Sequence, residues 1–171
     1  MNIDETWHRH LGVYGICLDE GKLLVVKKGR GPYIGRYDLP GGSVEVNESL
    51  QEALQREFRE ETGIDVHVAK HLGARDYIIP YELPNRGTSH IHQIALFYAV
   101  KSMEGTFLPQ SDHFYGQDAL GALWLPIQEL TTEHSSPLVV QAVEWFETGQ
   151  IPTGIMRLDD WIMNSNDWES K

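Results

Sequence analysis

Residues 42–64 of this chain predict a short helix that carries acidic side chains on the face expected to be apolar. The segment reads GSVEVNESLQEALQREFREETGI, and a helix turns by about 100° per residue. One side of the helix is therefore an apolar stripe of Leu50, Ala53, Leu54 and Phe58. Glu57, Glu60 and Glu61 fall on the same inner side, further along the helix. A helix that packs only against a hydrophobic core would not carry three carboxylates there.

These three carboxylates also repel one another, because residues at i, i+3 and i+4 are neighbours on a helix surface. They lie just before Thr62-Gly63, in the C-terminal turns, where the helix dipole disfavours negative charge. A charged run such as REFREE is by itself more typical of a solvated helix face. The inner placement here favours instead a bound divalent cation with oxygen ligands, and Mg²⁺ is the expected ion. The sequence therefore predicts a metal site.

The spacing of the surrounding residues matches a family pattern. Gly42 is followed after five residues by Glu48, and after seven more by the run REFREETGI at residues 56–64. This arrangement resembles the complete Nudix box, with every specified position filled. The flanking segments YDLPG at 37–41, WLP at 124–126 and EL at 129–130 agree with the resemblance. The resemblance covers approximately residues 8–150 and leaves both ends of the chain as variable additions.

The Nudix resemblance implies an α/β fold, in which a mixed central sheet forms an α/β/α sandwich. We expect a single domain over residues 1–171, with a variable C-terminal extension at 151–171. The implied activity is hydrolysis of a diphosphate bond in a nucleoside diphosphate linked to another group, with Mg²⁺ or Mn²⁺ as cofactor. The expected partner is such a small molecule, and a homodimer is a family-level expectation.

The resemblance also assigns roles to residues of the box. Glu60 and Glu61 are the firmest metal ligands, and Glu57 is a ligand or the general base that accepts a proton from water. Glu60 is the other carboxylate of the box that could act as this general base. The Gly41 carbonyl is a further expected ligand, because the double glycine lets backbone approach an ion closely. The guanidinium of Arg56 is expected to orient these acids during catalysis.

Three residues outside the box complete the predicted site. Lys28 and Arg30 belong to a basic, glycine-rich loop at 28–36 and are expected to contact substrate phosphate, although solvated charges are the commoner role. Asp118 ends the segment QSDHFYGQD at 110–118, from which we expect one more carboxylate to reach the metal. Asp112 is the other acid of that segment, and a turn-forming aspartate near Gly116 is an equally good interpretation of Asp118.

Hydrophobic periodicity predicts several strands and two helices around this site. The predicted strands lie at residues 11–18, 22–27, 64–72, 77–79, 90–101 and 124–125, and the second helix at 138–147. Residues 40–42 read as a turn. The first helix begins after Asn47 or Ser49, and Ser49 with Glu52 fits a capping box. Gly63 ends this helix.

Composition excludes some classes of function. A net charge of −11 argues against non-specific binding to nucleic acid or to an anionic membrane. No apolar run approaches the roughly 18 residues of a membrane span, and the N-terminus has no signal-peptide pattern. The single Cys17 lies in an apolar run and cannot form an internal disulfide, so we expect a buried thiol and a cytoplasmic protein.

Two alternatives to a hydrolase remain at this point. One is a non-catalytic Nudix domain that senses a nucleotide, which would not need the full set of carboxylates. The other is an isoprenoid diphosphate isomerase on the same scaffold, whose chemistry uses a cysteine, whereas Cys17 lies far from the box in sequence. The substrate is left open, and residues 76–89 are expected to form a loop that determines specificity.

Overall fold

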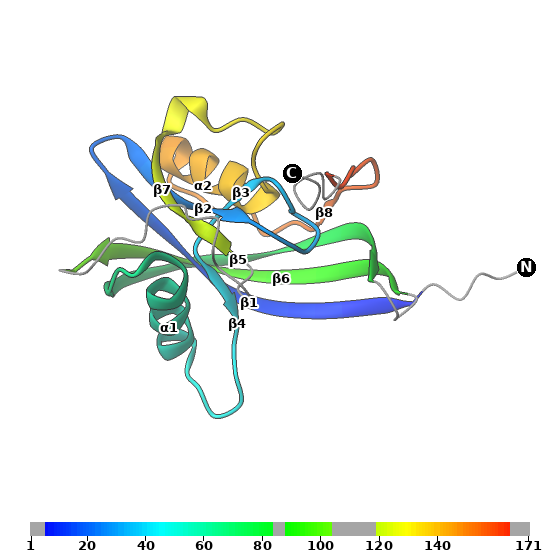
Figure 1. Cartoon of the computed structure of the whole chain (residues 1–171), viewed down its shortest axis with the longest axis horizontal. Helices are drawn as coiled ribbons and strands as arrows, with labels where there is room; N and C mark the ends of the chain where they lie inside the picture. The colour runs from blue at the N-terminus through cyan, green and yellow to red at the C-terminus, as the bar shows by residue number, and fades with distance from the viewer. Residues whose placement is uncertain (1–5, 84–87, 104–118, 165–171) are drawn as a thin grey trace, which may run out of the picture.

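The computed structural model describes residues 6–83, 88–103 and 119–164, and two helices lie on opposite sides of an eight-stranded mixed sheet (Figure 1). In chain order the elements are β1 (Trp7–Asp19), β2 (Lys22–Lys28), β3 (Tyr37–Asp38), β4 (Gly41–Ser43), α1 (Leu50–Thr62), β5 (Val66–Leu83), β6 (Thr88–Ser102), β7 (Ala119–Pro126), the 3₁₀ helix η1 (Ile127–Glu129), α2 (Pro137–Thr148) and β8 (Met156–Arg157). Among the described residues, neither helix is long and apolar enough to cross a membrane.

The sheet has the strand order β3-β2-β1-β6-β5-β8, with β4 paired to β1 and β7 paired to β2. β1 and β6 run parallel, from Trp7 opposite His90 to Cys17 opposite Val100. β5 is antiparallel to β6, and β8 is parallel to β5. The long strands β1, β5 and β6 extend well beyond α1 on the side of the N-terminus (Figure 1). The mixed sheet expected from the sequence is confirmed.

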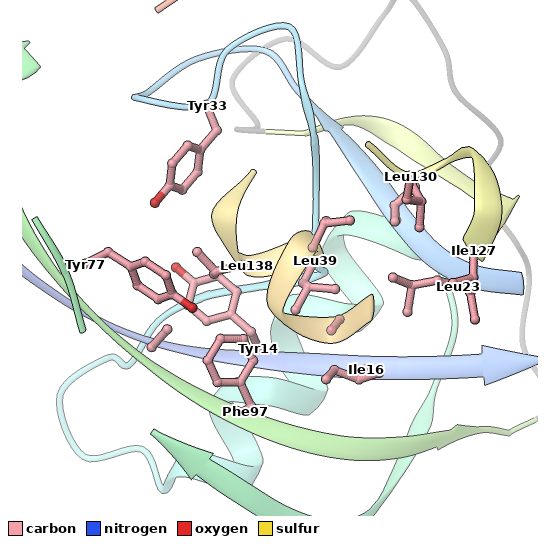
Figure 2. Packing of buried hydrophobic residues seen from close by; sticks show 14 of the residues in the cluster. Tyr14, Ile16, Leu23, Tyr33, Leu39, Tyr77, Phe97, Ile127, Leu130 and Leu138 are labelled. Carbon is pink, nitrogen blue, oxygen red and sulfur yellow. The ribbon is translucent and has the colours of Figure 1, made fainter. Parts of the chain in front are cut away.

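The core lies in two layers because side chains alternate between the faces of each strand. Val13 and Cys17 of β1 face α1 and pack with Phe58, whereas Tyr14 and Ile16 face α2. Figure 2 shows the layer beneath α2, where Leu138 of the helix lies above Tyr14, Ile16 and Phe97 of the sheet. The expected burial of Cys17 is confirmed, since 1% of the residue is exposed. The arrangement is an α/β/α sandwich, as predicted.

Local sequence determines both ends of α1. The Ser49 hydroxyl accepts a hydrogen bond from the Glu52 N–H at 3.2 Å, and the Glu52 carboxylate accepts one from the Ser49 N–H at 2.8 Å. Gly63 ends the helix in the left-handed region, with φ of 69°, and its N–H donates to the Arg59 carbonyl at 3.0 Å. The capping box and the glycine stop are confirmed.

Several predicted boundaries were wrong. β1 begins at Trp7 rather than at residue 11, and β7 is longer than the predicted strand at 124–125. The two strands predicted at 64–72 and 77–79 form one strand, β5, with register shifts at Val68/Lys70, His71/Gly73 and Pro80/Leu83 that absorb its irregular pattern. Residues 41 and 42 of the predicted turn belong to β4, which pairs with β1. Most of the loop expected at 76–89 is therefore strand, and residues 84–87 lie outside the described ranges.

The segment after α2 packs onto the body of the protein. Its strand β8 pairs with Tyr77 and Ile78 of β5. The Trp161 indole N–H donates to the Pro32 carbonyl at 2.9 Å, and the Arg36 guanidinium lies 4.1 Å from the centre of a Trp161 ring. These contacts connect the C-terminal segment to the loop between β2 and β3, which begins beside Lys28.

Candidate active site

An open cavity of about 290 Å³ is lined by residues of β1, β4 and α1 and by the end of β2 with the residues that follow it. Its walls combine the acids of the predicted box with cationic and aromatic side chains from other elements. The lining residues are His10, Tyr14, Lys28, Arg30, Gly41, Gly42, Ser43, Glu45, Arg56, Glu57, Glu60 and Glu61. Most of the predicted site residues therefore share one cavity.

Glu61 is the most buried acid of this cavity, with 6% of the residue exposed. Its carboxylate accepts a hydrogen bond from the Gly41 N–H at 2.9 Å, and the Lys28 ammonium lies 3.8 Å from its other oxygen. Burial raises the pKa of Glu61 to about 7, although Lys28 and the Gly41 N–H oppose the shift and Glu57 adds to it. The predicted contact of Gly41 with the metal is through its carbonyl, and that role stays a prediction.

Arg56 forms hydrogen bonds with several acids of the box. Its Nε and Nη2 donate to the two oxygens of Glu48 at 2.7 and 3.0 Å, and its Nη1 donates to Glu57 at 2.9 Å. Nη2 also donates to the Ser43 carbonyl at 3.0 Å, which joins α1 to β4. The hydrogen bond to Arg56 holds the pKa of Glu48 below its usual value, whereas burial raises the pKa of Glu57. The positive charge of the guanidinium thus lies between the carboxylates of Glu48 and Glu57 and offsets part of the charge of both.

Glu60 is less buried than the sequence analysis expected. Its side chain is 51% exposed, against 15% for Glu57 and 7% for Glu61, and it contacts Arg56 at 3.4 Å. The difference follows from helix geometry, because three residues turn by about 300° and so place Glu60 some 60° from Glu57, on the side away from Glu61. Glu60 lines the rim of the cavity rather than the inner face of α1.

The donor set is chemically suited to a hard divalent cation. Glu57, Glu60 and Glu61 open into one cavity and present only carboxylate oxygens. Within residues 6–83, 88–103 and 119–164, no three acidic, histidine or cysteine side chains converge closely enough to form a ready-made metal cluster. Instead, Arg56 and Lys28 contact the carboxylates. Mg²⁺ commonly binds through one or two carboxylates, waters and substrate phosphates, so these residues fit the ion.

The residues predicted outside the box have different outcomes. Lys28 and Arg30 line the cavity, and their contact with phosphate stays a prediction. Asp118 and Asp112 lie outside the described residues, and so does their predicted role.

Some residues of the cavity wall were not predicted from the sequence, and two of them, His10 and Tyr14, come from β1. The predicted strand began at residue 11, so His10 lay outside it. Both side chains point to the same face of β1, because they are an even number of residues apart. The alternation of His8, His10 and Tyr14 was the signal that could have identified this polar face.

Comparison with known proteins gives consistent results at three levels. The family model described as the NUDIX domain matches residues 6–148. An ADP-ribose pyrophosphatase of Methanocaldococcus jannaschii is 38% identical over 79 residues, which make up 46% of this chain and 43% of that protein. The phosphatase NudJ of Escherichia coli is 26% identical over 144 residues, covering 82% of this chain and 85% of NudJ. This chain thus spans less than half the length of the first of these relatives.

The fold is also shared with a solved structure. A mutator MutT protein from Bacillus halodurans superposes with a TM-score of 0.66, covering 91% of this chain and 95% of that one at 22% identity. At this identity the likeness concerns the fold alone. It confirms the α/β arrangement expected from the resemblance.

Proposed function

The chain belongs to the Nudix family, and on that premise we propose that it hydrolyses the diphosphate bond of a nucleoside diphosphate linked to another group, with Mg²⁺ as cofactor and Mn²⁺ as the alternative. The observation that carries the proposal is the composition of the cavity. The cavity is lined by the carboxylates of Glu57, Glu60 and Glu61 together with the basic side chains of Lys28 and Arg30. A bound cation and these basic side chains together suit a diphosphate group in an otherwise acidic protein.

The acids of the box and Arg56 each have a role in this proposal. Glu57, Glu60 and Glu61 would hold the ion, which when bound neutralises charge on the phosphoryl oxygens. Glu57 or Glu60 would accept the proton of the attacking water, and Asp118 is the further candidate for a metal contact or this step. Arg56 orients Glu57 through its 2.9 Å hydrogen bond.

Among the possible substrates, ADP-ribose is the first to test. The support is the M. jannaschii relative, which is named an ADP-ribose pyrophosphatase and matches 46% of this chain. We also propose a cytoplasmic location, on the ground of the buried and unpaired Cys17. A homodimer remains an expectation that light scattering of the purified protein would test.

The isomerase alternative has little support in the structure. Cys17 faces the core beneath α1 and is not among the residues that line the cavity. Burial raises the pKa of its thiol to about 11, which disfavours the reactive thiolate. A sensing domain without turnover is the alternative that an activity assay distinguishes.

The test is a panel of ADP-ribose, nucleotide sugars, dinucleoside polyphosphates and nucleoside triphosphates, assayed with Mg²⁺ for phosphate released directly or by added phosphatase. We expect Glu61→Gln and Glu60→Gln each to abolish most turnover and to leave the fold intact. A glutamine at position 61 can still accept the Gly41 N–H, so its metal-free melting temperature should be unchanged or raised. The matched control is Glu147→Gln, an exposed acid at the end of α2.

Two results would contradict the proposal. Absence of hydrolysis across the whole panel would favour the sensing alternative. Activity of both variants within about threefold of wild type, at saturating Mg²⁺, would remove the box carboxylates from the mechanism.

A further inference from the structure

A series of polar side chains crosses the core from the loop after β2 to the cavity. The Tyr33 hydroxyl donates to the side-chain carbonyl of Gln93, and the Gln93 amide donates to the Tyr14 hydroxyl at 2.8 Å. The Tyr14 hydroxyl lies 3.2 Å from Nε2 of His10, which lines the cavity. Tyr33 reaches from its loop toward the region of Tyr14 (Figure 2). Tyr33, Gln93 and Tyr14 are buried, and Tyr14 and His10 both line the cavity.

The hydrogen bonds of this series have a preferred direction. Among the described residues, Gln93 provides the acceptor for the Tyr33 hydroxyl. If the hydrogen bonds ran in the opposite direction, Gln93 would donate to Tyr33, and the buried hydroxyl hydrogen of Tyr33 would be left unpaired. An unsatisfied buried donor is costly, and the direction from Tyr33 through Gln93 to Tyr14 is therefore favoured. Burial raises the pKa of both tyrosines well above the usual value, so each keeps its proton. The Tyr14 hydroxyl, which already accepts from Gln93, then donates to His10.

This direction determines which ring nitrogen of His10 carries hydrogen. A neutral imidazole has one N–H and one acceptor nitrogen, so an accepting Nε2 places the hydrogen on Nδ1. Burial lowers the pKa of His10, and the nearby His8 and Lys28 lower it further, which favours the neutral ring. Nδ1 makes no hydrogen bond with any described residue. In this neutral form, the Nδ1–H group is the donor that His10 can offer to a ligand in the cavity.

We propose that His10 is a substrate-binding residue whose Nδ1–H donates a hydrogen bond to a phosphate oxygen of the diphosphate group, an inference that rests on the proposed function. The charged donors Lys28 and Arg56 are already paired with Glu61 and Glu57 in the same cavity. A neutral N–H is not drawn into an ion pair with these acids. His10 therefore supplies a donor that stays available for an anionic ligand.

The hydrogen position can be measured without any ligand. Nitrogen-15 chemical shifts of the histidine rings distinguish the two neutral forms, and we expect His10 to carry its hydrogen on Nδ1 in the wild-type protein. Tyr14→Phe keeps the ring and removes the hydroxyl, so it should shift His10 toward the Nε2–H form. A predominantly Nε2–H ring in the wild-type protein would overturn the proposal.

Binding of methylenediphosphonate, whose P–C–P bridge resists hydrolysis, then tests the contact by calorimetry in excess Mg²⁺. His10→Ala and His10→Gln should each weaken binding by about tenfold, as expected for one hydrogen bond to a charged oxygen. His10→Asn should stay within about threefold of wild type, because its amide nitrogen takes nearly the position of Nδ1. His8→Ala, on the same face of β1 but outside the cavity lining, is the matched control and should bind normally.

The outcomes separate this proposal from the one on which it rests. If the wild-type protein neither binds the probe nor hydrolyses any member of the panel, the proposed function fails and His10 loses its assignment with it. If the wild-type protein binds the probe and His10→Ala binds it equally well, the proposed function stands and the assignment of His10 alone is overturned. Melting curves of all variants establish that each one is folded.

Discussion

Replacing Arg56 by alanine tests how much the box depends on its internal cation. The substitution removes hydrogen bonds to Glu48, Glu57 and the Ser43 carbonyl, together with the longer contact to Glu60. It leaves Glu57, whose side chain is 15% exposed, beside Glu61 without a neighbouring guanidinium. We therefore expect losses of both stability and activity.

The size of the stability loss follows from the burial of these groups. Breaking a buried ion pair by removing one partner costs about 3–5 kcal/mol. The Arg56 side chain is 24% exposed, and the cavity lets water reach Glu60, so the lower end of that range applies. A loss of about 3 kcal/mol lowers the melting temperature of a chain of this size by about 6–12 °C. Activity should fall as well, because Glu57 and Glu60 lose the group that orients them.

The measurement is thermal unfolding in metal-free buffer, with Arg59→Ala as the matched control. Arg59 lies on the same helix and pairs with Asp65, but its side chain is 67% exposed, so its loss should cost no more than about 1 kcal/mol. Arg56→Lys should recover only part of the stability, since an ammonium cannot bridge Glu48 and Glu57 as the planar guanidinium does. Equal melting temperatures for Arg56→Ala and Arg59→Ala would refute this reasoning.

Three further predictions concern the metal, the acid outside the described residues and the backbone of β4. Mg²⁺ at a hundredfold excess over its dissociation constant should stabilise the protein by about 2.7 kcal/mol, and Glu57→Gln/Glu61→Gln should lose most of that gain in a thermal-shift assay. An equal gain in both proteins would place the cation elsewhere. Asp118→Asn should lower kcat by at least about tenfold and leave KM nearly unchanged in steady-state kinetics, whereas an unchanged kcat would return the role of base to Glu57 or another acid of the box. Gly41→Ala should cost about 2–4 kcal/mol in urea unfolding, because its φ is +146° and a Cβ would lie 2.1 Å from a backbone oxygen of β1. The control Gly21→Ala, with φ of +77° and open space around it, should cost only about 1–2 kcal/mol, and similar losses for both glycines would contradict the steric argument.

The sequence predicted the acid-bearing helix well because its determinants are local. The capping box of Ser49 and Glu52 and the stop at Gly63 involve residues only a few positions apart. Arg56 likewise reaches Glu57 and Glu60 on its own helix. Such contacts follow from helical spacing alone, so they can be deduced before any tertiary structure is known.

The parts that sequence analysis missed depend on pairing between distant segments. β1 extends back to Trp7 because β6 provides a hydrogen-bonding partner for residues whose own pattern is mixed. The contribution of His10 to the cavity depends on Gln93 and on Tyr33, which lie far away in the chain. The contact between Lys28 and Glu61 joins β2 to α1 in the same way. The pattern of charge and hydropathy along the sequence does not show which distant residues contact each other.

The parallel pairing of β1 with β6 also has a consequence for how the protein forms during synthesis. β2 and β4, which pair with the end and the middle of β1, are synthesised soon after it, but the partner of Trp7 is His90, which is made about eighty residues later. An isolated helix as short as α1 is marginal in water, and its apolar side packs on this sheet. The acid-bearing helix is therefore synthesised early, but the sheet that stabilises it is complete only after β6 has been synthesised. Folding should be a late, concerted step whose rate is limited by closure of this long loop.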